Sequence, residues 1–141
     1  MILINKNFIE LDTVNKMYRL TQDATDWAWC TRFDQNHAQF WLDADEQFQE
    51  VIDACGLADP QAVISGIRRT QDTGPYQISK GRVCAVMLNN DYQSNFGGGL
   101  QIGQSHYDIE PGTVIRYENQ IQQEFAPQQI NVVQTILYVY E

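Results

Sequence analysis

A series of short apolar segments, separated by turn residues, fills the second half of the chain and constrains the fold most. Gly, Pro, Asn and Asp cluster between these segments. Short strands that alternate with such turns are typical of β-sandwiches and β-barrels. We expect strands at residues 62–69, 76–79, 82–89, 99–102, 113–118, 121–125 and 130–140.

The last of these segments, residues 130–140, has apolar side chains at both odd and even positions. Successive side chains of a strand point to opposite faces of the sheet. A strand that is apolar on both faces is buried on both, so we expect it in the middle of a sheet.

Two amphipathic helices are predicted in the first half. Residues 13–21 carry Val14, Met17 and Tyr18 at helical spacing, with Asp12 or Thr13 as the N-cap. A second apolar stripe runs to Cys55 and is followed by Gly56, which suits a helix C-terminus.

Asp43 and Glu46 have the spacing of a capping box for this second helix. Between the helices, residues 27–33 and 38–42 alternate like strands. The prediction is a mostly β protein with two N-terminal helices in one domain, residues 1–141. In it, residues 1–61 support a core formed by residues 62–141.

Charge and composition exclude several functions. Eighteen acidic residues against nine basic ones give a net charge of -9, which repels nucleic acid and anionic membranes alike. No apolar run approaches the roughly 20 residues that span a bilayer, and we expect no signal peptide. Cys30, Cys55 and Cys84 form no CxxC pair and are expected to be free thiols in a reducing compartment. We therefore expect a cytoplasmic or virion protein.

The glycine run at residues 97–99 does not have the spacing of a phosphate-binding loop, and no helix is predicted after it. A turn that leads into a strand is the preferred interpretation.

His106 and Asp108 have the H-x-D spacing of a non-haem iron site, in which one strand presents both ligands on one face. Such a site needs a second histidine, and His37 is the only other one in the chain. Glu110 could instead complete a Ca²⁺ or Mg²⁺ site. A solvated strand edge without metal is the preferred interpretation.

Two stretches carry a resemblance to a known family: GRVCAVMLNNDY at residues 81–92 and GGGLQI at residues 97–102. They resemble the prolyl-hydroxylase branch of the Fe(II)/2-oxoglutarate oxygenases, and residues 108–117 and 133–140 are similar to two further strands of that family. The resemblance covers residues 62–141 and implies a double-stranded β-helix, or jelly roll.

The resemblance also gives positions for the family's iron and 2-oxoglutarate ligands. Its H-x-D pair falls on Ile78 and Lys80 or on Ser79 and Gly81, its distal histidine near Gln122, and its arginine near Asn131. Amides are poor iron ligands, and Asn lacks the bidentate grip of a guanidinium. Residues 111–115 are also similar to a turn of the cupins, whose following metal histidine is missing too. The resemblance thus implies the fold without its catalytic, cofactor-binding or metal-binding residues.

We therefore predict a non-catalytic oxygenase-like jelly roll without cofactor. It would act as a structural or protein-binding part of a larger assembly, such as a tailed-phage virion, through protein partners or self-assembly. One alternative is an Fe(II)/2-oxoglutarate-dependent protein hydroxylase whose atypical metal site uses His106, Asp108 and His37. Another is a binder of sugars or small ligands through Trp27, Trp29 and Trp41.

Overall fold

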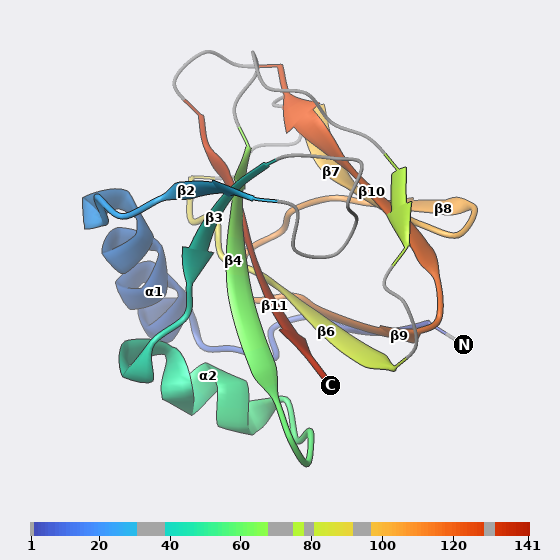
Figure 1. Ribbon diagram of the computed structural model, residues 1–141, viewed down its shortest axis with the longest axis horizontal. Coiled ribbons are helices and arrows are strands. Elements are labelled where there is room, and N and C mark those ends of the chain that lie inside the picture. The colour runs from blue at the N-terminus through green and yellow to red at the C-terminus, as the bar shows by residue number, and fades with distance from the viewer. Residues whose placement is uncertain (1, 31–38, 68–74, 78–80, 92–96, 129–131) are drawn as a thin grey trace.

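The structure is a computed structural model that describes residues 2–30, 39–67, 75–77, 81–91, 97–128 and 132–141. Two antiparallel β-sheets face one another (Figure 1). The larger sheet has the strand order β1 (Leu3–Asn5), β9 (Val114–Glu118), β6 (Arg82–Met87), β11 (Gln134–Tyr140), β4 (Gln61–Ile67), β3 (Gln39–Asp43) and β2 (Ala28–Cys30). The smaller sheet has the order β5 (Pro75–Gln77), β10 (Ile121–Pro127), β7 (Gly97–Ile102) and β8 (Ser105–Tyr107). The expected jelly roll is confirmed.

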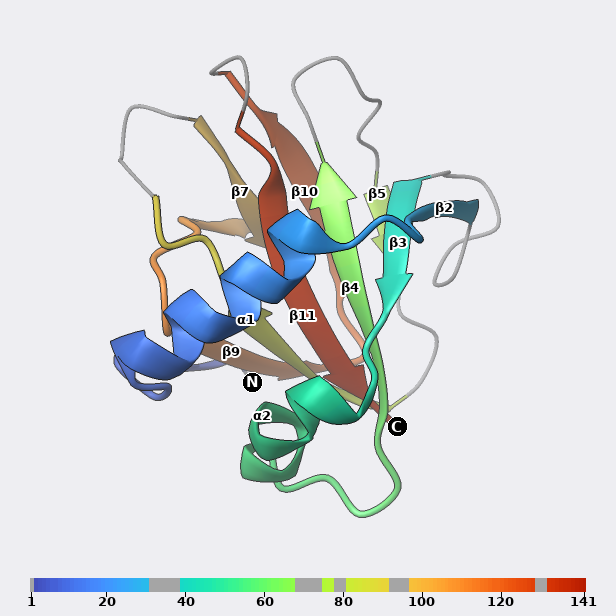
Figure 2. The ribbon, with the colours of Figure 1, turned by 90° about the vertical axis from the view of Figure 1, so that its left-hand side faces the viewer.

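Two helices cover the outer face of the larger sheet: α1 (Leu11–Asp23) and α2 (Gln49–Ala54), the latter preceded by the 3₁₀ turn η1 (Glu46–Phe48) (Figure 2). Helix α1 buries Val14, Met17 and Tyr18, as their spacing predicts. The predicted N-cap is wrong, because Asp12 and Thr13 lie inside the helix and Glu10 occupies the cap without a side-chain hydrogen bond. None of the described helices is long and apolar enough to cross a membrane.

The start of the second helical segment also differs from the prediction. Asp45, rather than Asp43, is the cap, and its Oδ1 accepts a hydrogen bond from the Gln47 backbone N–H at 2.9 Å. Asp43 is the last residue of β3 and pairs with Val63 of β4. Strand pairing therefore decides between two acidic residues that could both cap. Gly56 follows the helix with φ of +73°, as predicted.

Strand β11 lies between β6 and β4 and is buried on both faces, which confirms its predicted central place. Leu137 and Val139 belong to the outer core beneath the helices. Ile136 and Tyr138 belong to the inner core between the two sheets. The period-two alternation of one strand thus supplies both cores.

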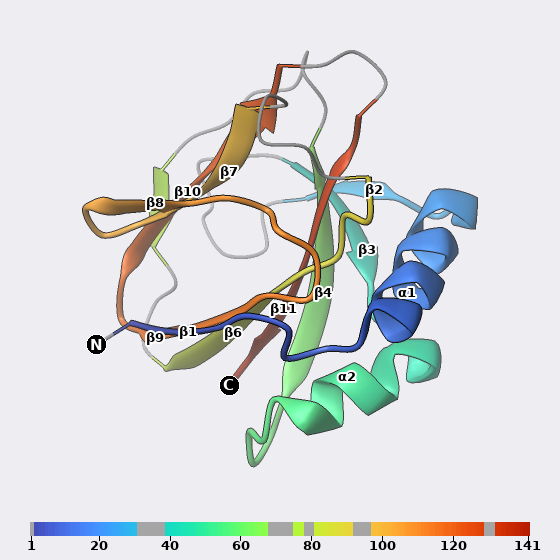
Figure 3. The same ribbon diagram turned by 180° about the vertical axis from the view of Figure 1, so that it is seen from behind.

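Strand β1 was not predicted, whereas β8, an exposed edge strand, agrees with the strand edge expected around His106. Each has three residues, too few for an alternation to be recognised. Strand β1 is exposed and pairs with β9 through Leu3 and Arg116, so tertiary pairing rather than local pattern creates it (Figure 3).

Asn89, two residues after β6 ends, joins β6 to β11. Its Oδ1 accepts a hydrogen bond from the Thr135 backbone N–H at 2.6 Å, and its Nδ2 donates to the Val133 carbonyl at 2.7 Å. The side chain is fully buried and continues the backbone ladder between the two strands. The Leu-Asn pair on which the family resemblance partly rests therefore has a structural role.

We expect Asn89→Ala to lower the free energy of unfolding by about 2 kcal/mol, because it leaves the buried Thr135 N–H without a partner and the Val133 carbonyl with only the Thr135 hydroxyl at 3.3 Å. The matched control is Asn90→Ala, whose exposed side chain bonds Asn15 at 3.1 Å and should matter by less than about 0.5 kcal/mol. Urea denaturation measures both. Equal losses in the two variants would contradict the role assigned to Asn89.

Candidate functional site

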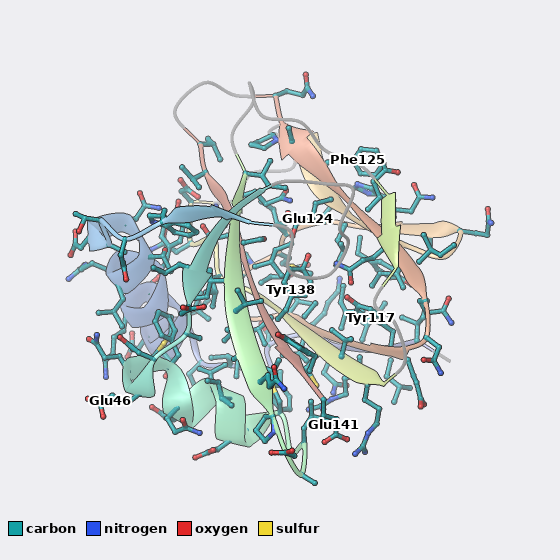
Figure 4. All side chains as sticks on the ribbon, viewed as in Figure 1. Glu46, Tyr117, Glu124, Phe125, Tyr138 and Glu141 are labelled. Atoms are coloured by element: carbon teal, nitrogen blue, oxygen red, sulfur yellow. The ribbon has the colours of Figure 1, made fainter. Side chains whose placement is uncertain are left out.

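The inner faces of the two sheets enclose an apolar core with one polar group of side chains in it. We call this group the interior polar cluster. Its members are Ser65, Tyr117, Gln122, Glu124, Gln134 and Tyr138, all of them buried. They come from β4, β9, β10 and β11, so both sheets contribute (Figure 4).

Strand β10 contributes Gln122 and Glu124 because its side chains alternate. Ile121 is 58% exposed, whereas Gln122 and Glu124 are fully buried. Once Gln122 points inward, period two requires Glu124 to point inward as well. Gln122 was considered from the sequence and Glu124 was not. The alternation of side chains along β10 would have predicted that Glu124 lies on the same face as Gln122.

Glu124 is the one acidic side chain of the cluster. The Ser65 hydroxyl donates a hydrogen bond to its Oε1 at 2.6 Å, and the Tyr138 hydroxyl donates to the same oxygen. Its Oε2 is buried and has no hydrogen-bond partner among the described residues.

Burial raises the pKa of Glu124 to about 7, and the hydrogen bonds from Ser65, Tyr138 and Gln134 oppose this rise. Taking a carboxylate out of water disfavours its charged form more than these neutral donors favour it. At neutral pH this carboxyl group can therefore gain or lose a proton inside the protein.

Gln122 has a partner of its own, since the Tyr117 hydroxyl donates a hydrogen bond to its Oε1. Burial raises the pKa of Tyr117, and the nearby Glu124 carboxylate raises it further, so this phenol stays neutral. The Gln122 amide is therefore part of an uncharged hydrogen-bonding pair.

Gln134 connects the two sheets. Its Oε1 accepts a hydrogen bond from the Gly99 backbone N–H at 2.6 Å, and its Nε2 donates to the Gly99 carbonyl at 3.3 Å. A Cβ atom on Gly98 would lie 2.5 Å from the same Oε1. The glycine run, predicted as a turn into a strand, forms the first residues of β7 and lets this amide approach the backbone.

His106 and Asp108 lie near one another at the surface, with side chains that are 45% and 62% exposed. Nε2 of His106 is 2.8 Å from the Gly98 carbonyl oxygen, which can only accept, so Nε2 carries a proton. The other ring nitrogen lies 4.0 Å from Asp108 Oδ1. The ring also contacts Phe125 of β10, with centroids 5.6 Å apart.

The metal sites considered above need a third ligand beside His106 and Asp108: His37 for iron, or Glu110 for Ca²⁺ or Mg²⁺. Glu110 forms an ion pair with Lys6 at 3.4 Å, and His37 lies outside the described residues. Across the described residues, no three His, Cys, Asp or Glu side chains gather in a way that could hold a metal ion.

Of the three tryptophans, Trp27 packs partly buried against the outer core, and a Cβ on Gly66 would meet its ring at 2.8 Å. Trp27 therefore serves packing. The side chains of Trp29 and Trp41 lie outside the described part of the structure.

Of the positions that the resemblance assigns to iron and 2-oxoglutarate ligands, two are described. Gln122 points into the interior polar cluster, and Gly81 has φ of +121° with no room for a Cβ beside the Glu141 carbonyl. Ile78, Ser79, Lys80 and Asn131 lie outside the described residues. The cluster offers hydroxyls, amides and one carboxyl group but no imidazole, and this donor set does not fit Fe(II).

Comparison with known proteins gives a match for the structure only. No family model matches the sequence, and no curated protein matches it. A prolyl-4-hydroxylase from Pseudomonas putida superposes with a TM-score of 0.76 at 14% identity, covering 99% of this chain and 91% of that one. The chain has the fold of the Fe(II)/2-oxoglutarate oxygenases.

Two further solved structures agree with this result. A viral collagen prolyl hydroxylase from Paramecium Bursaria Chlorella virus-1 gives a TM-score of 0.70 at 7% identity, covering 99% of this chain and 87% of the other. The alpha ketoglutarate dependent epimerase SnoN from nogalamycin biosynthesis gives 0.73 at 4% identity, covering 99% and 77%. At such identities the likeness concerns the fold.

We expect the free energy of unfolding to fall as the pH rises from about 4.5 to about 7, because folded Glu124 keeps a proton that the unfolded chain releases in this window. The full effect amounts to about 3 kcal/mol. Glu124→Gln, which stays neutral, should lose this fall. Urea denaturation at pH 5 and pH 8 measures it.

The matched control is Glu118→Gln, which removes an exposed carboxyl group at the end of β9 and should keep the wild-type fall. If Glu124→Gln showed the same pH dependence as the wild type, the buried carboxyl group would not be its source.

Proposed function

We propose that the protein is a non-catalytic jelly roll with the oxygenase fold, which acts by binding other protein chains within a larger assembly. The observation that carries the proposal is the state of Gln122. The resemblance assigns the family's distal histidine to this position or one near it, and Gln122 is a buried amide whose oxygen accepts a hydrogen bond from Tyr117. An amide held in this way offers no ligand for iron.

The surface supports a role in protein binding. Strand β1 lies at the edge of the larger sheet and, in the described part of the chain, pairs with β9 alone. Its Leu3 and Ile4 are 52% and 45% exposed. An exposed apolar edge strand can accept a strand from another chain, which adds to the sheet. The net charge of -9 directs such binding towards protein rather than nucleic acid.

We expect isothermal titration with Mn(II) or Fe(II), in the presence of 2-oxoglutarate, to give no saturable heat, because the interior polar cluster lacks an imidazole ligand. A prolyl hydroxylase with its full ligand set serves as the positive control. Micromolar binding of metal and 2-oxoglutarate together would overturn the non-catalytic proposal and favour a protein hydroxylase.

If the chain assembles with itself, we expect its mass from light scattering to rise with protein concentration. We expect Ile4→Lys to lower the association constant about tenfold, because a charge on an edge strand blocks pairing. Ile121→Lys is the matched control, because Ile121 is 58% exposed but lies on β10, which is paired on both sides. A monomer at every concentration would count against self-assembly.

A virion role further predicts that the chain is found in purified particles.

A further inference from the structure

Outside the interior polar cluster, two cysteines and an arginine meet on the outer face of the larger sheet. Cys84 lies on β6, Cys55 follows α2 as its C-cap, and Arg116 lies on β9. Both cysteines are buried and neither forms a disulfide. The sequence predicts free thiols at both positions.

Arg116 is fixed beside the sulfur of Cys84. Its Nη1 lies 3.0 Å from Cys84 Sγ and donates a hydrogen bond to the Cys55 carbonyl at 2.6 Å. Its guanidinium also lies over the Phe8 ring, 5.3 Å from the centroid. A cation held at this distance stabilises a thiolate relative to a thiol.

The two cysteines are in direct contact. Cys84 Sγ lies 3.9 Å from the carbonyl oxygen of Cys55, to which its thiol can donate a hydrogen bond. The neighbouring Cys55 thiol, as a hydrogen-bonding group, lowers the pKa of Cys84 most. Burial raises this pKa, the charges of Arg116 and then Arg82 lower it, and Glu141 raises it. The pKa of Cys55 is raised, first by hydrogen bonding with the Cys84 sulfur and then by burial. One sulfur is thus set to be the nucleophile and the other to keep its proton.

A cavity of about 250 Å³ lies against this pair. Both cysteines, Arg82 and Arg116 line it, together with apolar residues that include Leu3 and Leu57. A cavity of this size has room for a small uncharged oxidant.

We propose that Cys84 and Cys55 form a two-cysteine site that reduces a hydroperoxide and closes to a disulfide between β6 and the end of α2. The Cys84 thiolate attacks the terminal peroxide oxygen, the O–O bond breaks, and the departing alkoxide takes a proton to become an alcohol. This leaves a sulfenic acid on Cys84. The Cys55 sulfur then displaces the hydroxyl group, which leaves as water with the Cys55 proton. Two electrons from two thiols thus reduce one peroxide.

The wild-type protein tests this directly. It is treated with hydrogen peroxide, blocked with an alkylating reagent, digested without reduction and mapped by mass spectrometry. We expect a disulfide between the Cys55 and Cys84 peptides, and we expect Cys30→Ser to give the same product. A disulfide that involves Cys30, or no disulfide while the fold is intact, would overturn the proposal.

The order of the two steps is tested in Cys55→Ser, where no second thiol can resolve the sulfenic acid. We expect dimedone to label Cys84 in this variant. Labelling of Cys55 in the matched variant Cys84→Ser, at a comparable rate, would show that the assigned nucleophile is wrong.

The role of Arg116 is tested by a pH profile of Cys84 alkylation with iodoacetamide. We expect Arg116→Gln to slow the reaction at pH 7 by about tenfold, the effect of one pKa unit on the thiolate fraction. At pH 10 the rates should converge, whereas a loosened structure would change them at every pH. Arg116→Lys, which keeps a cation, should restore most of the rate, and equal slowing by both variants would refute the electrostatic role.

Discussion

The burial of β11 on both faces is the constraint on which the rest of the structure depends. Its backbone pairs with β4 and β6, its outward side chains anchor the two helices, and its inward side chains line the space between the sheets. Asn89 extends the pairing of this strand with the segment after β6. A change in the position of β11 would therefore disturb both cores at once.

The space between the sheets contains a polar cluster that follows from the same arrangement. Side chains that alternate along β4, β10 and β11 bring Ser65, Glu124 and Tyr138 together, and hydrogen bonds replace the water that these groups lose. A single carboxyl group without a cationic partner can stay buried because it can stay protonated. The cluster joins the sheets without requiring a metal ion.

Strong local patterns made much of this fold predictable. Three patterns predict their structures from a few neighbouring residues: the apolar stripe of α1, the alternation of β11 and the turn residues between strands. The helix N-caps and the three-residue strand β1 were not predictable, because competing strand pairing and distant partners decide them. Asp43 illustrates this, since only its pairing with Val63 in β4 removes it from the cap.

The candidate sites divide in the same way. The family resemblance directed attention to Gln122, and alternation could have added Glu124. The meeting of Cys55, Cys84 and Arg116 depends on how α2 crosses the sheet, and no local spacing in the sequence encodes it. Residues that meet only through tertiary packing are those that sequence reasoning misses.

The double hydrogen bond between Gln134 and the Gly99 peptide group has a mechanical consequence. The Gln134 amide accepts from the backbone N–H of Gly99 and donates to its carbonyl, so it links the two sheets as a backbone hydrogen-bond pair would. Sliding one sheet over the other would break both hydrogen bonds together. Apolar contacts are not directional and would resist such sliding less. The barrel should therefore resist shear along its strands.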